Sequence, residues 1–409
     1  MTTCRICSNP LGSTLELGMQ PICNRYLRNK NDSQKFYPLS LSICHSCATV
    51  QLSKLIPYNE ITPPYGWLRY NEPEDHLDDL IQKIIKLPGL HKKSKIFGIS
   101  YKDDTTLQRF QKQGFRSTYR LNTKDDLSIQ NYQHAGIEAI QAHLTEACSH
   151  QITKKYGKAD LLVARHILEH AQQPINFMKA LLELVSDNGY LVFEVPNEDK
   201  AINSYDVMFV WEEHVTYFTP ITFSNFFNNF FCEIVESHSY PYPFEGSLIG
   251  IIKKNINSKK HLINRIQLRD ELNRFVNLST AVKNNNHLYK KYLAHIKKKQ
   301  NAIAFFGAGH LTAKFINIYK LETYIDFVVD KDLNKQGYYM PGSALPIFPI
   351  AALIDNNIKF CLIGVNPNIE NIILETNAPF IEAGGTFLSI YNNSELSINK
   401  AIEMVLSNE

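Results

Sequence analysis

Two carboxylates and an imidazole are neighbours in the run Trp211-Glu-Glu-His-Val-Thr-Tyr-Phe218. Histidine is the side chain best suited to take up a proton near neutral pH, and an adjacent carboxylate can orient it or raise its basicity. His214 with Glu213 is therefore a candidate general base of the kind that removes a proton next to a ketone. The alternative is a surface loop with solvated charges, but the flanking aromatic residues favour a partly buried cleft.

A second histidine-bearing segment, Arg165-His-Ile-Leu-Glu-His170, directly follows the apolar residues 159–164. We predict a strand over those apolar residues, which places the segment at a strand's carboxyl end. Ligands of α/β sheets bind at such ends, so His166 and His170 are candidate cofactor or substrate groups. Capping and packing roles at a helix N-terminus are the alternative for both histidines.

Four cysteines have the spacing of a zinc site. Cys4 and Cys7 form one Cys-x-x-Cys pair, and Cys44 and Cys47 form a second. Two such pairs can supply four thiolates to one tetrahedral zinc ion. Cys23 lies close enough along the chain to be a substitute ligand. We predict a structural zinc site with no open coordination position.

Composition limits the class of protein. The 409 residues suffice for two or three domains, and a hydrophobic fraction of 44% supports a sizeable core. A net charge of +3 is too small to indicate a nucleic-acid partner. No apolar run approaches the roughly 20 residues of a membrane-spanning helix, and no apolar signal segment begins the chain. We therefore expect a cytoplasmic protein without nucleic-acid or membrane partners.

The elements that position these residues alternate between strands and helices after an N-terminal zinc module. Hydrophobic periodicity predicts helices over residues 76–87, 105–113 and 175–185, and strands over residues 95–99, 117–121, 159–164 and 190–195. Repeated β-α units of this kind predict an α/β fold with a doubly wound parallel sheet, whose ligands bind at the carboxyl ends of the strands.

A second α/β pattern occupies the C-terminal part. Polar residues 255–299 have helical spacing and predict a connecting helix pair, followed by strands over 303–306, 327–330, 360–363 and 386–390. The turn Gly307-Ala-Gly-His-Leu-Thr312 and Asp330 nearly match a dinucleotide-binding fingerprint, with Thr312 at the third glycine position. NAD binding there is an alternative, although a lone Gly-x-Gly is a weak signal.

Most of the chain resembles the three-domain sugar C-methyltransferases, which act on nucleotide-linked 4-keto-deoxysugars. The resemblance is carried by both cysteine pairs and by these motifs: His166-Ile-Leu-Glu-His170 with Pro174, Glu213 to Phe218, Val329-Asp330, Asn334-Lys-Gln-Gly337, Met340-Pro-Gly342 and Leu345-Pro346. It implies a class I methyltransferase (Rossmann-like) core over residues 61–254. A zinc-binding domain would occupy residues 1–60, and a helical connector with a Rossmann-like domain residues 255–409.

The same resemblance implies a reaction. A base removes the C3 proton next to the C4 ketone, and the resulting enediolate takes the methyl group of S-adenosylmethionine. By resemblance His214 is the base, supported by Glu213, and His170 binds or polarises the sugar. Tyr65 and Tyr70 lie near the position of the family's active-site tyrosine, with a loose alignment. The implied partners are a nucleotide sugar, S-adenosylmethionine and structural zinc.

The cofactor loop departs from the usual methyltransferase pattern. Gly98 remains, but bulky Tyr101 and Lys102 stand near the expected glycines, and Asn122 replaces the acid that normally holds the ribose. Asp103 is a candidate substitute. The predicted cofactor contacts are therefore the backbone near Gly98 together with Ser100, Asp103, Asn122, Ala164, Arg165 and His166.

Two other functions stay open at this point. The altered loop at Gly98 and the turn at Gly307 allow a related sugar-nucleotide isomerase or oxidoreductase that keeps the enolising base. A non-catalytic protein with a degenerate cofactor site is the third possibility. Trp211 also stands where the family usually has a tyrosine, which removes a hydroxyl group from this position.

Overall fold

The computed structural model describes residues 3–62, 72–130, 135–242, 246–258, 263–299 and 302–406. The chain divides into two compact units. Unit 1 comprises Met1–Thr14, Leu41–Asp199 and Trp211–Asn273, and unit 2 comprises Leu15–Ser40, Lys200–Val210 and Arg274–Glu409. The predicted catalytic and zinc-binding residues all belong to unit 1.

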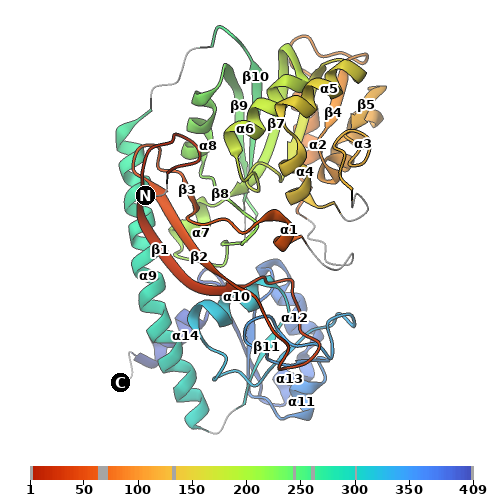
Figure 1. The fold of residues 1–409 in the computed structure, drawn as a ribbon. Coiled ribbons are helices and arrows are strands. Elements are labelled where there is room, and N and C mark those ends of the chain that lie inside the picture. The colour runs from red at the N-terminus through yellow and green to blue at the C-terminus, as the bar shows by residue number, and fades with distance from the viewer. Residues whose placement is uncertain are drawn as a thin grey trace. The chain divides into compact units, whose positions relative to one another are not determined.

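The central sheet of unit 1 has six strands in the order β5-β4-β6-β7-β10-β9 (Figure 1). They are β4 (Lys95–Gly98), β5 (Ser117–Arg120), β6 (Ala159–Arg165), β7 (Val185–Asn197), β9 (Cys232–Tyr240) and β10 (Gly246–Lys254). The four strands from β5 to β7 are parallel, whereas β10 pairs antiparallel with both β7 and β9. The parallel arrangement expected for β4 to β7 is confirmed, and the sheet is extended at one edge by β9 and β10, an antiparallel pair that the sequence analysis did not predict.

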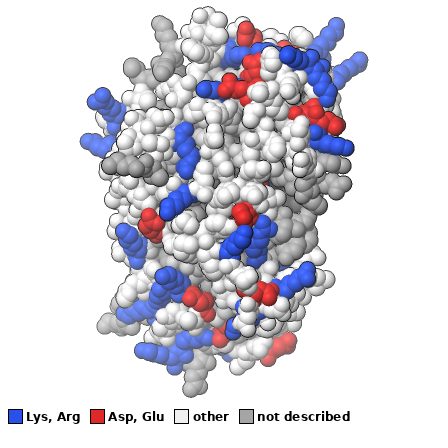
Figure 2. All heavy atoms as spheres, in the orientation of Figure 1, with Lys and Arg blue, Asp and Glu red and all other residues white. Residues whose placement is uncertain are grey.

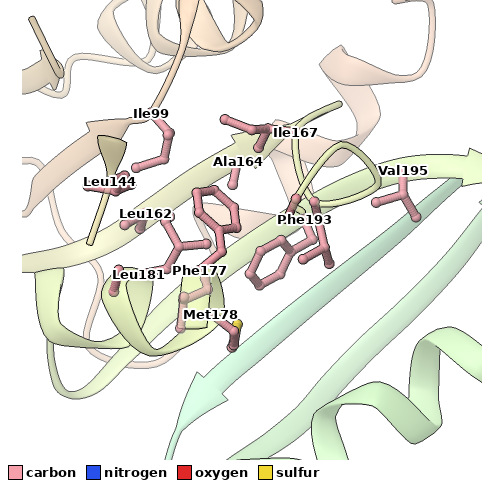
Figure 3. Close-up of a cluster of buried hydrophobic side chains, with 14 of the residues drawn as sticks. Ile99, Leu144, Leu162, Ala164, Ile167, Phe177, Met178, Leu181, Phe193 and Val195 are labelled. Carbon is pink, nitrogen blue, oxygen red and sulfur yellow. The ribbon is translucent and has the colours of Figure 1, made fainter. Parts of the chain in front are cut away.

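Helices cover both faces of this sheet. They are α2 (Leu77–Ile84), the short η1 (Tyr101–Asp103), α3 (Asp104–Lys112), α4 (Ile137–His143), α5 (Glu146–Tyr156), α6 (Pro174–Leu184), α8 (Pro220–Phe226) and η3 (Phe227–Asn229). Helix α7 (Asp199–Asn203) belongs almost wholly to unit 2. Leu161 and Val163 of β6 belong to the core formed with α2 and α3. Leu162 and Ala164 belong to the core on the other face, with α6 (Figure 3). Burial on both faces explains why β6 is an uninterrupted apolar run.

The predicted elements of this sheet are confirmed, with shifted ends. Strands β4, β5 and β6 and helices α2, α3 and α6 lie within a few residues of their expected ranges, and β7 begins at Val185 rather than Tyr190. Helices α4 and α5 between β5 and β6 were not predicted. The Thr145 hydroxyl caps α5 by accepting a hydrogen bond from the backbone N–H of Cys148.

A second sheet connects the zinc-binding segment to the catalytic run. Its order is β1-β2-β3-β8, from strands β1 (Leu11–Pro21), β2 (Phe36–Cys44), β3 (Val50–Leu52) and β8 (Thr216–Tyr217), and helix α1 (Tyr58–Ile61) follows β3. Strand β8 begins two residues after His214 and pairs antiparallel with β3. The zinc-binding segment therefore contributes directly to the position of the predicted base.

Unit 2 contains a five-stranded parallel sheet in the order β13-β12-β11-β14-β15. The strands are β11 (Ile303–Phe306), β12 (Phe327–Val329), β13 (Ile347–Phe348), β14 (Phe360–Ile363) and β15 (Thr386–Ser389). The accompanying helices are α10 (His310–Tyr319), α11 (Ala352–Asp355), η4 (Pro367–Ile369), α12 (Glu370–Thr376), α13 (Ala378–Glu382) and α14 (Ile398–Leu406). This confirms the second α/β pattern.

The connector is one long helix, α9 (Arg265–Lys298), and the predicted helix pair is wrong. Its 34 residues contain neither glycine nor proline, so nothing in the sequence forces the chain to turn. Basic and acidic side chains are interspersed on the surface drawn in Figure 2, in keeping with the small net charge. Among the described residues, no helix combines the length and apolar character needed to cross a membrane.

Candidate active site and zinc centre

The four predicted cysteines come together in unit 1. The Sγ atoms of Cys4 and Cys47 lie 3.6 Å apart, and those of Cys7 and Cys44 lie 3.5 Å apart. All four sulfur atoms lie within 4.8 Å of one another. Tetrahedral ligands about 2.3 Å from a zinc ion have sulfur atoms about 3.8 Å apart, so this cluster fits one zinc.

Polar groups around the cysteines support thiolates. The backbone N–H groups of Ile6 and Ser46 point to the sulfur atoms of Cys4 and Cys44, each at 3.4 Å. The side-chain amide of Gln51, on β3, donates to Cys4 Sγ at 3.1 Å. Donors directed at sulfur stabilise the negative charge that the metal-bound form carries. Cys23 is buried but is not a member of this cluster.

The chain turns sharply after each cysteine pair. Ser8 and Ala48 both have positive φ, 61° and 56°, and their N–H groups donate to the carbonyls of Cys4 and Cys44. The two turns are thus built alike. A side chain at positive φ costs free energy, which the metal site and the surrounding fold must offset.

Strand β8 and its neighbours hold the predicted base in place. The backbone N–H of Leu52, in β3, donates to the Val215 carbonyl at 3.0 Å. On the other side, the carbonyl of Glu169 accepts bonds from Val215 at 2.7 Å and Thr216 at 3.1 Å. His214 is consequently fixed between the zinc-binding segment and the loop after β6.

Two imidazoles meet at this position. The rings of His170 and His214 lie 4.6 Å apart, centroid to centroid, in an edge-to-face arrangement. Trp211 stacks on His214 with ring centroids 5.7 Å apart and planes inclined by 20°. Ligand atoms of Glu138, His170 and Glu213 lie within 4.8 Å of one another. The structure therefore brings His170, His214 and Glu213 together, and adds Glu138, which the sequence analysis missed.

Glu138 controls the charge of His170. Its Oε1 lies 3.1 Å from His170 Nδ1, and both side chains are buried. Burial alone lowers the pKa of His170, but the carboxylate of Glu138 outweighs burial and raises it above its ordinary value. Burial raises the pKa of Glu138, whereas the bond from His170 brings it below the ordinary value. The ion pair with Glu138 thus favours the charged form of His170 beside His214.

The other predicted histidine, His166, belongs to a neighbouring charge network. Its Nε2 lies 3.4 Å from Glu194 Oε1 and its Nδ1 lies 3.5 Å from Glu169 Oε1. Burial lowers its pKa, but the carboxylates of Glu72 and Glu194 outweigh burial and raise the pKa of His166 to about 10. His166 also has a positive φ of 48°. It carries charge within the protein core at the end of β6.

Arg165, predicted to contact the cofactor, makes several bonds within the protein. Its guanidinium is buried and pairs with Glu194, with Glu74 Oε1 at 3.1 Å, and with the Lys102 carbonyl at 2.7 Å. His76, in turn, places its Nε2 2.9 Å from Glu194 Oε1. These bonds neutralise the guanidinium within the protein and connect β6 and β7 to the turn after β4.

Asp103 also serves the fold. Its carboxylate accepts hydrogen bonds from the backbone N–H groups of Ile99 at 2.7 Å, Ser100 at 2.8 Å and Arg165 at 2.9 Å. The side chain is fully buried, and burial raises its pKa to about 6. Asp103 therefore joins the carboxyl end of β4 to that of β6, and it uses N–H groups that sequence analysis assigned to the cofactor.

The remaining predicted cofactor residues are placed as follows. Gly98 is required for packing, because an added Cβ would lie 2.9 Å from Asp103 Cβ and 3.0 Å from a Leu107 methyl carbon. Ser100 and Ala164 are buried beside it, and the Ser100 hydroxyl accepts from the Lys102 backbone at 3.2 Å. These contacts fix the turn after β4.

Asn122 closes its own turn at the end of β5. Its Oδ1 accepts hydrogen bonds from the backbone N–H groups of Lys124 and Asp125, each at 2.9 Å. The nearby carboxylate of Asp126 is bound to Tyr119, Tyr156 and the Asn122 backbone. Both side chains thus form hydrogen bonds within the protein, at the position where methyltransferases usually have an acid that binds the ribose of the cofactor.

The charges at the end of β4 nevertheless fit the amino-acid end of S-adenosylmethionine. Lys102 stands near an expected glycine position, and its Nζ lies 2.7 and 2.6 Å from the two carboxylate oxygens of Glu72. A cationic and an anionic side chain side by side match the carboxylate and ammonium groups of an amino acid. The sequence analysis noted Lys102 only as bulk and did not single out Glu72.

The candidate tyrosines Tyr65 and Tyr70 lie outside the described residues. In unit 2, the carboxylate of Asp330 accepts a hydrogen bond from the Ala308 backbone at 2.7 Å and pairs with Lys335 at 3.3 Å. This acid therefore anchors the Gly307 turn. The Thr312 hydroxyl donates to the Gly307 carbonyl within the same turn. These bonds give no support to the alternative of NAD binding.

Comparisons with known proteins cover most of the chain. A zinc binding domain model matches residues 4–61, a methyltransferase domain model residues 73–237, and a C-methyltransferase C-terminal domain model residues 260–390. C-methyltransferase NovU of Streptomyces niveus is 19% identical over 402 residues, which cover 94% of each chain.

Solved structures are more distant. An N1-methyltransferase of Burkholderia thailandensis with bound 1,6-didemethyltoxoflavin and S-adenosylhomocysteine is 10% identical, with 44% of this chain and 77% of that chain covered and a TM-score of 0.30. An S-adenosylmethionine-dependent methyltransferase of Anabaena variabilis is 14% identical, with coverages of 44% and 86% and a TM-score of 0.32.

The three family models follow one another in the order zinc-binding, methyltransferase and C-methyltransferase C-terminal domain, and the NovU match spans all three. Both comparisons favour methyl transfer over the isomerase, oxidoreductase and non-catalytic alternatives. The four clustered cysteines lie in the residues that the zinc-binding model matches, and His170 and His214 lie in those that the methyltransferase model matches. The chain is an S-adenosylmethionine-dependent C-methyltransferase that carries, in order, a zinc-binding domain with structural zinc, a methyltransferase domain and a C-methyltransferase C-terminal domain.

Proposed function

We propose that this enzyme methylates C3 of a nucleotide-activated 4-keto-sugar through an enediolate. The observation that carries the proposal is the pair of imidazoles, buried His170 and half-buried His214, 4.6 Å apart with a carboxylate beside each. One imidazole held cationic next to a second imidazole is the arrangement that enolisation of a ketone requires, since a base and an electrophile must act on adjacent atoms.

His214 acts as the base. It takes the C3 proton, and the electrons of that C–H bond move toward the C4 oxygen. Glu213 stabilises the imidazolium that forms, and Trp211 holds the ring plane by stacking on it. When bound, S-adenosylmethionine would supply the methyl group: the bond from C3 to the methyl carbon forms as the methyl–sulfonium bond breaks, and S-adenosylhomocysteine leaves. The proton on His214 passes to solvent.

His170 acts as the electrophile. Because Glu138 raises its pKa, the ring is an imidazolium that can donate a hydrogen bond to the C4 oxygen as negative charge develops there. Removing one such donor typically costs 10²- to 10³-fold in rate, so we assign the pair a large share of the barrier reduction.

The nucleotide-sugar substrate is supported by the motifs shared with sugar C-methyltransferases, including His166 to His170 and Glu213 to Phe218. The domain limits of residues 1–60, 61–254 and 255–409 are part of the same proposal. Thiolate ligands persist in a reducing compartment, so we place the reaction in the cytoplasm.

Solvent exchange tests the proposal. The enzyme is incubated in D₂O with UDP-, dTDP- or GDP-linked 4-keto-deoxysugars and S-adenosylhomocysteine, and deuterium at C3 is followed by NMR. We expect exchange with the wild type and its loss with His214→Ala, whereas His150→Ala, an exposed histidine, exchanges normally. Unchanged exchange in His214→Ala excludes it as the base. Absence of exchange with every keto-sugar contradicts the substrate class.

A further inference from the structure

The turn after β4 differs from an ordinary glycine-rich cofactor-binding turn, because its backbone N–H groups are bound within the protein. Such a turn lets the protein backbone approach a cofactor closely. Here the N–H groups of Ile99 and Ser100 are bound to the Asp103 carboxylate, and the Asn122 side chain closes its own turn. In other methyltransferases, backbone N–H groups and an acid that binds the ribose recognise the cofactor. In this enzyme, charged side chains at this edge of the sheet must therefore recognise it instead.

Lys102 and Glu72 are such side chains. The Lys102 ammonium contacts both oxygens of Glu72, at 2.7 and 2.6 Å, and the two side chains are only 14% and 17% exposed. Lys102 lies within η1, directly after β4, where its carbonyl is fixed by the Arg165 guanidinium at 2.7 Å. The pair is thus partly desolvated and rigidly mounted.

The charges of this pair also act on groups of the proposed reaction centre. Burial raises the pKa of Glu72, but the positive charges of His166 and Lys102 outweigh it and keep that carboxyl ionised. The charge of Lys102 also acts on Glu138 and on His170. Electrostatic influence of this kind requires that Lys102 lie close to the proposed reaction centre.

We propose that Lys102 and Glu72 bind the amino-acid end of S-adenosylmethionine. The Lys102 ammonium receives the α-carboxylate, and the Glu72 carboxylate receives the α-ammonium. The bond between the two side chains is exchanged for two charge-assisted bonds to the ligand, so no charge is left unpaired. The inference rests on the use of S-adenosylmethionine and adds the residues that replace the glycine-rich turn.

Two ligands that differ only at the amino-acid end provide the test. S-Adenosylhomocysteine carries the α-carboxylate and α-ammonium, whereas 5′-methylthioadenosine keeps the adenosine and sulfur but lacks both charges. Calorimetry gives the Kd of each. We expect Lys102→Met and Glu72→Gln to weaken S-adenosylhomocysteine roughly 10- to 100-fold and to leave 5′-methylthioadenosine within about twofold.

Controls separate recognition from folding. Lys102→Arg keeps the charge and should restore much of the preference for S-adenosylhomocysteine, and Lys83→Met, from the exposed pair with Asp79, should bind both ligands normally. Equal weakening of both ligands in Lys102→Met and Glu72→Gln would show a structural role and overturn the inference. Binding of neither ligand by the wild type would instead refute the cofactor itself, and the inference with it.

Discussion

His170 shows how one buried carboxylate can decide the chemistry of an imidazole. A buried histidine is ordinarily neutral, because desolvation disfavours its charged form. Glu138, 3.1 Å away, reverses this and raises the pKa of the ring above its ordinary value. In the proposed mechanism His214, stacked on Trp211, accepts the proton. The two rings lie edge to face, with centroids 4.6 Å apart.

Glu138→Gln tests this division of labour. Without the carboxylate, burial lowers the pKa of His170, and the imidazolium is lost at a lower pH than in the wild type. We expect kcat at neutral pH to fall roughly 100-fold and the alkaline limb of the pH–rate profile to move to lower pH. Glu146→Gln, at an exposed position, is the control. An unmoved alkaline limb would show that Glu138 does not set the charge of His170.

His166 makes stability depend on pH. Its pKa is about 10 in the folded protein and 6.5 ordinarily, so its contribution is fully present below about pH 6.5 and is lost as the pH rises to about 10. For Glu194 the folded pKa lies well below 4.5, so its contribution is present above pH 4.5 and is lost on acidification. Together the two favour the folded state most between these limits.

Urea unfolding of the wild type and His166→Asn at several pH values measures this effect. Asparagine tolerates the positive φ of this position, so the substitution mainly removes the charge. We expect the difference in free energy of unfolding to be a few kcal/mol near pH 6 and to shrink toward pH 10. A difference that stays constant with pH would refute a cationic His166.

At the scale of elements, the turns of the two cysteine pairs and strand β8 together hold His214 in position. The second cysteine pair lies between β2 and β3, and β3 pairs with β8, which begins two residues after His214. The loop after β6 holds the same segment through the Glu169 carbonyl. A metal far from the chemistry can in this way determine where the base stands.

Ala48→Gly should stabilise the turn of the second cysteine pair. Ala48 has a φ of 56°, a conformation that is unfavourable with a Cβ and readily adopted by glycine. We expect the free energy of unfolding to rise by roughly 0.5–1 kcal/mol, and Ala48→Val to lower it, because β-branched residues tolerate positive φ poorly. Denaturant titration of the zinc-loaded protein measures both. A less stable glycine variant would contradict a strained turn.

Elements were predictable from sequence where one pattern dominated. Strand β6 was identified because it is apolar on both faces, and α2 because its buried residues recur at helical spacing. Strands β9 and β10 were not predicted at all, and the antiparallel pairing of β10 with β7 depends on residues about fifty to sixty positions apart in sequence. The predicted helix pair over residues 255–299 was wrong, because the sequence of α9 contains no glycine or proline that would end a helix.

Site residues were predictable to a similar degree. The cysteine spacing predicted the four-thiol cluster, and the neighbouring Glu213 and His214 predicted one half of the proposed catalytic pair. Glu138 and Glu72 were not predicted, because neither lies in a recognisable motif and each depends on a partner distant along the chain. The sequence also did not predict that the Asp103 carboxylate accepts a hydrogen bond from the Arg165 backbone, because the two residues come from separate loops.

At the scale of the whole molecule, the zinc cluster and the catalytic strands belong to the same compact unit. The parts of the zinc-binding segment that carry the four cysteines, residues 3–14 and 41–62, therefore belong to the methyltransferase half of the chain, whereas Leu15–Ser40 belongs to unit 2. The family models treat residues 4–61 and 73–237 as separate modules. In the structure, the cysteines of the first module and the central sheet of the second belong to one compact unit.

Removal of zinc tests whether the metal site supports the catalytic segment. Elemental analysis should find about one zinc per chain, and Cys44→Ser should lower that content. Extraction with a chelator should reduce kcat more than it weakens S-adenosylhomocysteine binding, because the metal supports His214 through β3 and β8 while Lys102 and Glu72 lie elsewhere. A metal-free protein with wild-type kcat would contradict a structural role for zinc.

The central claim is transfer of a methyl group to carbon. The direct measurement combines S-adenosylmethionine labelled with ¹³C in its methyl group and a nucleotide 4-keto-sugar labelled with ¹³C at C3, followed by NMR of the product. The account predicts one-bond coupling between the transferred methyl carbon and C3. A methyl group bound to oxygen or nitrogen, or no transfer to any nucleotide keto-sugar, would contradict it.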